Sequence, residues 1–492
     1  MQRRKKRGER HTFASGPTAA TVLSLSAVLA VHACGGRTRL EGSLTGTTTT
    51  AGTFANTAGA PSSASGGSSV TMGGSIAMAI GGTSPNGAFG GAAPIGGTAA
   101  ATGGAGGAGD VCNNPSTGCP AGTSCVSGRC LPLQTNPDLT HIAARTFTTG
   151  NALTSIVLGD WNGDGLVDVA TANSTDSSVS ALLGKGDGNF APRVDYMVGA
   201  APYSLATCDL NKDKKADLVS ANRGDGTVAV LLGKGDGTFS TDGLYLCPNG
   251  GSGRAIACAD LNDDGIADVA VLNNNGMLAT VSVLMGTGTG KLAAKVDYST
   301  AANPTAIAIG DLNHDGMPDV VTGNYNPAHV SVLLGKGDGT LAPHVDRKDP
   351  TDGTRSIAIA DLNGDGDADL GIGDAEGRGP PGNFGMNPGN GDGTFEAEIS
   401  YPPVISGCEV AAGDLDADGR LDLIGTTSRG LGILFGLAGG KLVRGADFRL
   451  EHSGTCALAA GDLNGDKRLD VVVKEGPNQI SSWLGVGDGT FR

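Results

Sequence analysis

The sequence has 492 residues, of which 84 are glycine and only 4% are aromatic, and its formal net charge is −15. This composition favours short strands joined by tight turns and argues against thick helical cores. The acidic balance argues against a nucleic-acid-binding protein, which would carry a basic footprint, while the length allows several domains.

Residues 1–33 have the three parts of an export signal. Basic residues fill much of the first ten positions, an apolar run extends from about Thr18, and small residues end the segment. The run is shorter than the roughly 20 apolar residues of a membrane-spanning helix. The next residue, Cys34, is followed by two glycines and resembles the lipidated cysteine of the bacterial lipoprotein lipobox. This resemblance implies a lipid anchor at the outer membrane or cell surface; without lipidation the exported protein would be secreted.

The next two segments predict a flexible tether and a small disulfide-rich module. Residues 34–110 are dominated by glycine, serine, threonine and alanine and have no charge between Gly42 and Gly109. They cannot bury enough apolar surface to offset the entropy of ordering. Residues 111–132 hold four cysteines, for which an exported chain allows three disulfide pairings: Cys112, Cys119, Cys125 and Cys130. The alternative, a zinc site, prefers more closely spaced cysteine pairs.

From about residue 138 to residue 492 the sequence repeats with a period near fifty residues. The segment DWNGDGLVD, which begins at Asp160, recurs six more times at intervals of 49, 51, 51, 50, 53 and 48 residues. The later copies begin at Asp209, Asp260, Asp311, Asp361, Asp414 and Asp462. A fixed period of this length indicates a repeat architecture, so we expect one repeat domain over residues 138–492.

Each repeat contains the signals of four short strands, which the second repeat shows most clearly. SLATC precedes the acidic loop, DLVSAN follows it, TVAVLLG leads into the turn KGDG, and a fourth strand begins at Phe239. Four strands in each of seven repeats predict an all-β, seven-bladed β-propeller. The last repeat ends before its fourth strand, whereas HIAARTFTTG from His141 matches that strand. We therefore expect residues before Leu153 to complete blade seven and remove an open sheet edge.

The acidic loops have the ligand pattern of a calcium site. Oxygen-bearing side chains occupy positions 1, 3, 5 and 9, and a main-chain carbonyl is available at position 7. Ca²⁺ takes roughly six to eight such oxygens, and glycine at position 6 gives most of the loops the backbone freedom of a tight turn. Nearly half of the acidic residues lie in these loops, so the negative charge indicates a demand for cations. An EF-hand is excluded because the first loop has Thr171, not glutamate, at position twelve.

Up to seven Ca²⁺ ions are expected, one in each loop. The expected ligands are Asp160, Asn162, Asp164, Leu166 and Asp168 in loop 1; Asp209, Asn211, Asp213 and Asp217 in loop 2; Asp260, Asn262, Asp264, Ile266 and Asp268 in loop 3; Asp311, Asn313, Asp315, Met317 and Asp319 in loop 4; Asp361, Asn363, Asp365, Asp367 and Asp369 in loop 5; Asp414, Asp416, Asp418, Arg420 and Asp422 in loop 6; and Asp462, Asn464, Asp466 and Asp470 in loop 7. Lys214 and Lys467 replace the glycine in loops 2 and 7, where a left-handed conformation costs on the order of 1 kcal/mol. These two sites should be the weakest.

The tandem of GDLNGDGxxDLVV-like loops and VLLGKGDGTF-like turns resembles the FG-GAP and VCBS repeat family. Blades of this family build the head of integrin α subunits and of many bacterial surface proteins. The resemblance covers about residues 138–492. It implies that each acidic loop joins the first and second strands of its blade and holds Ca²⁺.

Two features of the repeats depart from a regular pattern. The fifth repeat has prolines between Gly371 and Gly393, where a third strand should run, so part of this blade should be loop. Cys408 and Cys456 lie at equivalent inner-strand positions of neighbouring repeats and are disulfide candidates if their Cα atoms lie within about 7 Å. Cys258 with Cys247 is a second candidate pair.

No nucleophile with an adjacent base stands out, and the paired carboxylates all fall in the cation loops, so we expect no enzyme. The acidic loops and GDG turns should share one face, whereas the segments around Arg223, Cys247, Asn324 and Glu376 should share the other and differ between repeats. Such variation places recognition on that second face.

The expected function is a calcium-stabilised, cell-surface or secreted binding or adhesion module with no catalytic activity. Its ligand would be an extracellular protein or polysaccharide, and no nucleic acid is expected. The alternative is a carbohydrate-binding, lectin-like propeller, against which stands the scarcity of tryptophan, with only Trp161 and Trp483. A lyase or hydrolase is the third candidate.

Overall fold

The computed structural model describes residues 123–126, 129–132, 145–246, 252–274, 279–325, 328–348, 353–374, 384–401, 407–427, 430–445, 447–450 and 456–492. The predicted signal, Cys34, the tether over 34–110, Cys112 and Cys119 lie outside these residues. Cys125 and Cys130 are register partners in the hairpin of β1 (Thr123–Val126) and β2 (Arg129–Pro132). The described residues contain no helix, and therefore no helix capable of crossing a membrane.

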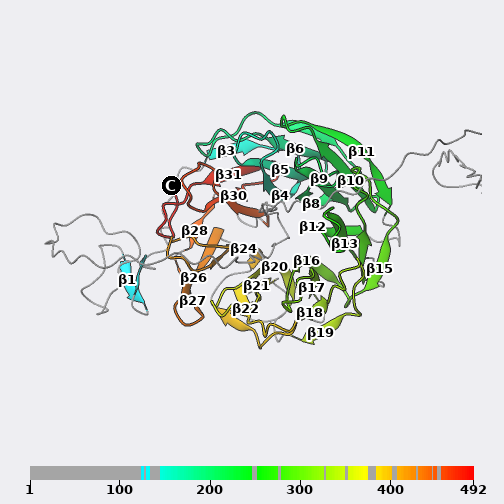
Figure 1. The fold of residues 1–492 in the computed structure, drawn as a ribbon. Coiled ribbons are helices and arrows are strands. Elements are labelled where there is room, and N and C mark those ends of the chain that lie inside the picture. Colours follow the sequence, from blue (N-terminus) through cyan, green and yellow to red (C-terminus); the bar gives the residue numbers. More distant parts are fainter. Residues whose placement is uncertain are drawn as a thin grey trace, which may run out of the picture. The chain divides into compact units, whose positions relative to one another are not determined.

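The repeats form seven antiparallel sheets arranged as the blades of a propeller, as predicted (Figure 1). Blade 1 consists of β4 (Leu153–Gly159), β5 (Asp168–Asn173), β6 (Ser178–Leu182) and β7 (Val194–Met197); blade 2 of β8 (Pro202–Cys208), β9 (Asp217–Asn222), β10 (Thr227–Gly233) and β11 (Phe239–Leu246); blade 3 of β12 (Ser252–Ala259), β13 (Asp268–Asn274), β14 (Ala279–Leu284) and β15 (Val296–Ser299). Blade 4 consists of β16 (Pro304–Gly310), β17 (Asp319–Tyr325), β18 (Ala328–Leu333) and β19 (Val345–Lys348); blade 5 of β20 (Thr354–Ala360), β21 (Asp369–Asp374), β22 (Phe384–Asn387) and β23 (Ile399–Tyr401).

The last two blades depart from the regular arrangement of four consecutive strands. Blade 6 consists of β24 (Gly407–Gly413), β25 (Asp422–Thr427) and β26 (Gly430–Leu437), and its outer strand is divided into β27 (Lys441–Arg444) and β28 (Phe448–Arg449), which both pair with β26. Blade 7 consists of β29 (Leu458–Gly461), β30 (Asp470–Lys474), β31 (Gln479–Trp483) and β3 (Arg145–Thr148).

Strand β3 closes the ring, which confirms the prediction that the segment before Leu153 completes the seventh blade. Arg145 to Thr148 pair antiparallel with Ser482 to Gln479 of β31, and Figure 1 shows the cyan β3 beside the red β31. The ring of Phe147 lies edge-on to Phe190 of the first repeat, with the ring centroids 4.9 Å apart. The two ends of the repeat domain are therefore joined by main-chain and aromatic contacts.

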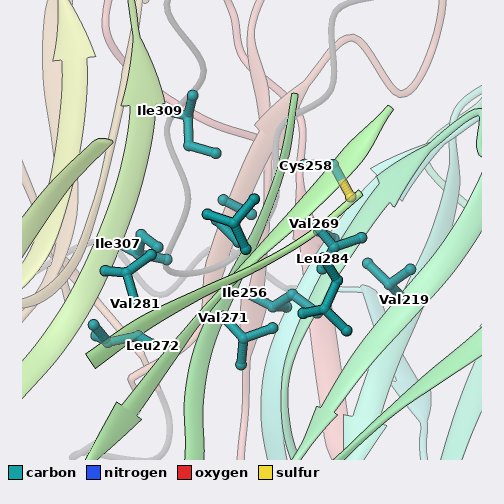
Figure 2. Packing of buried hydrophobic residues seen from close by; sticks show 14 of the residues in the cluster. Val219, Ile256, Cys258, Val269, Val271, Leu272, Val281, Leu284, Ile307 and Ile309 are labelled. Carbon is teal, nitrogen blue, oxygen red and sulfur yellow. The ribbon is translucent and has the colours of Figure 1, made fainter. Parts of the chain in front are cut away.

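The core lies between neighbouring blades. The second strands of the blades are buried along most of their length, whereas outer strands such as β7 and β15 are largely exposed. Inner and middle strands are covered on both faces by adjacent blades, which explains their continuous apolar sequence. Figure 2 shows one such layer, in which Ile256 and Val271 of blade 3 pack with Val219 of blade 2 and Ile307 of blade 4. Each fully buried aliphatic side chain contributes about 1.5–3 kcal/mol.

Among the described residues, two disulfides join neighbouring blades at or next to their inner strands. Cys408 is bonded to Cys456 across blades 6 and 7 (Cα–Cα 5.1 Å), as the sequence had suggested. Cys258 is bonded to Cys208 of blade 2 (Cα–Cα 6.2 Å), so the expected pairing of Cys258 with Cys247 is wrong. The reason is geometric, because Cys208 and Cys258 both stand within two residues of the first aspartate of their loops, at adjacent ends of β8 and β12.

The irregularity expected in blade 5 is present in part. A third strand does form, but β22 is only four residues long and begins after the first two prolines. Residues 375–383, which contain these two prolines, lie outside the described residues.

Candidate metal site: the seven acidic loops

Each acidic loop joins the inner strand of a blade to its second strand, and its side chains are tied to its own main chain in the same way seven times. In loop 1, Asp160 accepts hydrogen bonds from the main-chain N–H groups of Gly163 and Gly165 (2.7 and 2.9 Å). The main-chain N–H of Leu166 donates to Asp164 (2.8 Å). The bond from position 6 to the first aspartate recurs in all loops, with donors Gly165, Lys214, Gly265, Gly316, Gly366, Gly419 and Lys467. The sequence therefore winds each loop around its first aspartate.

Two positions of every loop take left-handed backbone conformations, whereas only position 6 was expected to do so. At position 6, Lys214 and Lys467 have φ of 64°, which confirms that lysine stands there in the conformation that favours glycine. Position 4 is also left-handed, at φ values between 56° and 77°, in Gly163, Lys212, Asp263, His314, Gly364, Ala417 and Gly465. Because the residue type at position 4 varies, no single residue type indicates this conformation.

The ninth aspartate is fully buried and ties the loop to the rest of the blade. In loop 1, Asp168 accepts hydrogen bonds from the main-chain N–H groups of Trp161 (2.9 Å) and Gly184 (2.7 Å). The equivalent pair of bonds is present for Asp217, Asp268, Asp319, Asp369, Asp422 and Asp470. Each oxygen keeps a further lone pair, so the residue can also ligate a cation.

Glycine is required where the hairpin of strands three and four meets the loop. A Cβ atom at Gly184 would lie 2.2 Å from the carbonyl oxygen of Val167, and one at Gly233 equally close to that of Ala216. The first glycine of the repeated GKGDG turn thus allows its N–H to reach the ninth aspartate. This contact could not be predicted from the sequence, because its two partners are about sixteen residues apart in the repeat.

The loops are also connected from blade to blade. The N–H of Gly237 in the GDG turn of blade 2 donates to the carbonyl of Trp161 in loop 1 (3.0 Å). The same bond links later turns to the preceding loops through Gly290, Gly339, Gly393 and Gly489. His314 of loop 4 lies 2.7 Å from Asp367 of loop 5, and this hydrogen bond raises the pKa of the histidine.

Loop 6 brings its predicted acidic ligands together most closely. Asp414, Asp416 and Asp422 offer oxygen atoms that all lie within 4.8 Å of one another, and Asp416 is only 4% exposed. In the other six loops position 3 is asparagine. In loop 1 its amide group donates to the Asp164 carboxylate (2.8 Å), and loops 3, 4, 5 and 7 have the same contact.

Burial raises the pKa of the carboxyl group at position 9 of each loop. Loss of hydration raises its pKa to about 6 in loops 1 to 5 and 7, with smaller contributions from neighbouring aspartates and opposition from the main-chain donors. In loop 6, burial, together with smaller contributions from the charges of Asp416 and Asp418, raises the pKa of Asp422 to about 8. A divalent cation beside such a carboxyl favours the ionised form and offsets this cost.

The residues present therefore fit a hard cation. All side-chain donors at positions 1, 3, 5 and 9 are oxygens, as Ca²⁺ and Mg²⁺ require, and no thiolate or imidazole stands at these positions. The position-7 side chains of loop 6 and loop 7, Arg420 and Arg468, form ion pairs with the position-5 aspartates of their own loops. Any carbonyl ligand at these positions would come from the main chain.

The fold and the loops define a class of protein, a seven-bladed propeller built from repeats with an acidic loop after each inner strand. The sequence matches the family described as FG-GAP-like repeat over residues 160–220, 209–271, 260–322, 311–372 and 414–473, which together exceed half of the chain. The chain belongs to this family of FG-GAP-like repeat proteins.

Solved structures with the same general fold have little sequence in common with this chain. A lectin of Agrocybe aegerita, solved for its recognition of non-reducing terminal N-acetylglucosamine, is 18% identical and has a TM-score of 0.45, over 64% of this chain and 86% of the lectin. BBS1N in complex with ARL6DN is 11% identical (TM-score 0.48, 69% and 93% covered). The Dos1 propeller is 10% identical (TM-score 0.44, 69% and 94% covered). No curated protein matches the chain.

Proposed function

We propose that the chain is a non-catalytic binding module, stabilised by divalent cations in its acidic loops, that presents its opposite face to a ligand. The observation that carries the proposal is the sevenfold oxygen-donor pattern at one end of the inner strands, with three carboxylates within 4.8 Å in loop 6. Ca²⁺ is the ion that suits such flexible, all-oxygen loops. The ions would also stabilise the ring, because five of the seven loops are hydrogen-bonded to the turn between strands three and four of the next blade.

The ligand face is the one where the inner strands begin. There the turns between strands two and three differ in sequence, from Ser174–Ser177 in blade 1 to Arg223–Gly226 in blade 2 and Glu475–Asn478 in blade 7. Connections that vary on a repeated scaffold are the usual place of recognition. Export and anchoring through Cys34 are part of the proposal and rest on the sequence of residues 1–34 alone. They would place the propeller at the cell surface, or outside the cell if the cysteine is not lipidated.

Calcium dependence is tested by thermal unfolding of the purified protein with chelator, Ca²⁺ or Mg²⁺, together with elemental analysis. Each site held at one hundred times its Kd adds about 2.7 kcal/mol to the free energy of unfolding, so Ca²⁺ should raise the Tm clearly. Asp416→Ala should remove one bound ion, and Asp242→Asn, an exposed acid of β11, should remove none. A metal-free protein whose Tm ignores added Ca²⁺ would contradict the proposal.

The binding function is tested by recovering what the purified protein captures from extracellular material, with and without chelator. Capture that depends on Ca²⁺ supports a binding module. Turnover of a substrate, abolished by changing an acid outside the loop positions 1, 3, 5 and 9, would instead indicate a lyase or hydrolase.

A further inference from the structure

One residue of each blade stands at or near the start of its inner strand, six residues before the first aspartate of the loop. We call these seven residues the mouth ring: Thr154, Tyr203, Arg254, Thr305, Arg355, Cys408 and Cys456. The inner strands follow one another around the propeller axis, and β29 contacts β4 to complete the circle. The mouth ring therefore surrounds the axis on the face opposite the acidic loops, where the ligand face was placed above.

Side-chain hydroxyl groups already satisfy several main-chain groups near the mouth ring. Thr154 donates to the carbonyl of Pro202 in the next blade (3.0 Å), and Thr305 donates to that of Thr354. Ser155, Ser204 and Ser356 accept hydrogen bonds from the main-chain N–H groups of Leu205, Ile256 and Val410 in the following blades. A peptide that added to an inner strand at these positions would not find these groups available.

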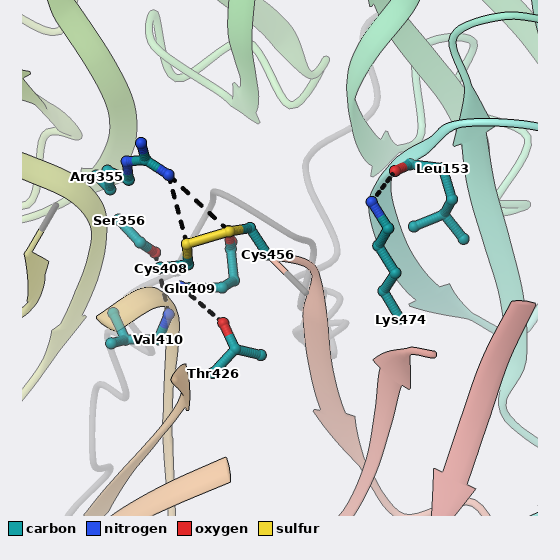
Figure 3. The surroundings of a disulfide bond; sticks show 9 residues. All are labelled: Leu153, Arg355, Ser356, Cys408, Glu409, Val410, Thr426, Cys456 and Lys474. Atoms are coloured by element: carbon teal, nitrogen blue, oxygen red, sulfur yellow. Dashed lines mark hydrogen bonds between the residues drawn. A yellow bond between two sulfur atoms is a disulfide. The ribbon is translucent and has the colours of Figure 1, made fainter. Parts of the chain in front are cut away.

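The side chains that stay available at the mouth, which is the opening that the mouth ring surrounds, are basic and aromatic. The Arg223 guanidinium lies over the ring of Tyr203, 5.2 Å from its centroid. Arg355 is exposed, and its Nη1 lies 3.4 Å from the sulfur of Cys408 (Figure 3). Burial lowers the pKa of the half-buried Arg254, Tyr203 acts in the opposite direction, and the charges of Arg223 and Arg355 lower it further. Arg223 and Arg355 therefore each lie within electrostatic range of Arg254.

No described carboxylate forms an ion pair with this cluster. None of the ion pairs among the described residues involves Arg223, Arg254 or Arg355, and the groups that shift the pKa of Arg254 include no acid. Asp225 accepts hydrogen bonds from the N–H of Ala200 and from Thr227. Glu409, beside the disulfide in Figure 3, is 5% exposed. Among the described residues, the cluster thus gathers three arginines without an ion-pairing carboxylate, on a chain whose net charge is −15.

We propose that Tyr203, Arg223, Arg254 and Arg355, the mouth cluster, bind the carboxylate-bearing sugar units of an acidic polysaccharide. This inference names a ligand class for the proposed binding function and rests on that function. Guanidinium groups recognise carboxylates through paired N–H donors, and the phenol ring offers an apolar surface to the sugar ring beside them. The engaged main-chain groups disfavour the competing ligand, an acidic peptide added as a strand.

The test is isothermal titration of the full chain with a hexamer of galacturonic acid and with the same hexamer methyl-esterified, at constant Ca²⁺. The acid should bind at least about tenfold more tightly than the neutral ester, because each charge-assisted pair is worth a factor of this order. Raising the ionic strength should weaken binding of the acid. Arg254→Gln and Arg355→Gln should each reduce affinity about tenfold or more.

The matched control is Arg193→Gln, which removes one positive charge from the β6–β7 connection of blade 1 and should leave affinity unchanged. Arg355 is exposed, so its variant remains informative if Arg254→Gln fails to fold. Equal binding of acid and ester, full affinity in both variants, or tighter binding of polyglutamate than of the hexamer would overturn the mouth cluster as a site for acidic sugars. A ligand captured independently of Arg254 and Arg355 would overturn this site and leave the binding function standing. The opposite failure, no Ca²⁺-dependent capture of any ligand, would remove the function itself.

Discussion

The two ends of the inner strands follow opposite rules. At the loop end, every blade repeats one set of contacts, in which an aspartate such as Asp168 receives hydrogen bonds from its own loop and from the following hairpin. At the mouth end, the residue at the equivalent position is threonine, tyrosine, arginine or cysteine according to the blade. The same residue is expected in every blade where each blade needs the same contact to fold. Different residues are tolerated at positions whose role belongs to the whole molecule and not to each blade. The comparison therefore assigns a structural role to the loop end and agrees with the recognition that we propose for the mouth.

The two disulfides do not follow this division, since one lies at each end of the inner strands. Cys208–Cys258 joins blades 2 and 3 next to the acidic loops, and Cys408–Cys456 joins blades 6 and 7 at the mouth. Only the second contacts a residue of the mouth cluster, through Arg355.

Removing the closing strand should have the largest effect. A variant lacking residues 1–152 loses β3, and with it the pairing to β31 and the contact of Phe147 with Phe190. We expect a loss of about 4–6 kcal/mol in the free energy of unfolding, measured by chemical denaturation. A variant lacking residues 1–140 is the control and should keep its stability. Equal denaturation midpoints for the two variants would show that ring closure contributes nothing to stability.

Removing a disulfide comes next. Each bond closes a loop of about fifty residues, with sequence separations of 50 and 48, so the serine pair variants should each lose about 3–4 kcal/mol through unfolded-state entropy. The two should differ in binding: Cys408→Ser with Cys456→Ser should weaken the acidic hexamer, whereas Cys208→Ser with Cys258→Ser should not. Equal affinities in the two double variants would dissociate the mouth disulfide from the site.

Within one loop, substitutions at positions 9 and 5 should separate the contribution to folding from the contribution to cation binding. Asp319→Ala removes the acceptor of the N–H groups of Leu312 and Gly335, and should lower the free energy of unfolding by about 2–3 kcal/mol even with chelator. Asp315→Ala should be destabilising mainly when Ca²⁺ is present. Thermal melts of both variants with and without chelator measure this difference; an equal loss of stability in the two variants with chelator present would contradict separate roles.

The smallest effect should come from position 6. Lys214→Gly relieves a left-handed lysine at φ 64° and should stabilise the protein by about 1 kcal/mol and strengthen Ca²⁺ binding in loop 2. The reverse change, Gly316→Lys in loop 4, has room for a Cβ atom and should cost a similar amount. Melting curves with added Ca²⁺ report both changes, and a shift of the same sign in the two variants would argue against the backbone explanation.

Most of the architecture could be predicted from periodicity, because a fifty-residue repeat with four strand signals leaves few folds. The partner of β31 was also predictable, since HIAARTFTTG resembles the strand that the last repeat lacks. The dual role of Asp168 was not, because its bond to Gly184 depends on how closely a hairpin approaches a loop. Neither was the pairing of Cys258, which follows the adjacency of inner strands in space and not nearness in sequence. The mouth cluster could not be predicted as a unit, because Tyr203, Arg254 and Arg355 come from three different blades and only superposing the repeats aligns them; of its members, only the segment around Arg223 was expected on this face.

The closing strand has a mechanical consequence. All residues N-terminal to Arg145 are covalently continuous with β3, which is held in the ring by pairing over four residues of β31. A pulling force on that part of the chain is borne first by this pair, before any other blade is loaded. Under tension, the propeller would open at the junction of its first and last blades.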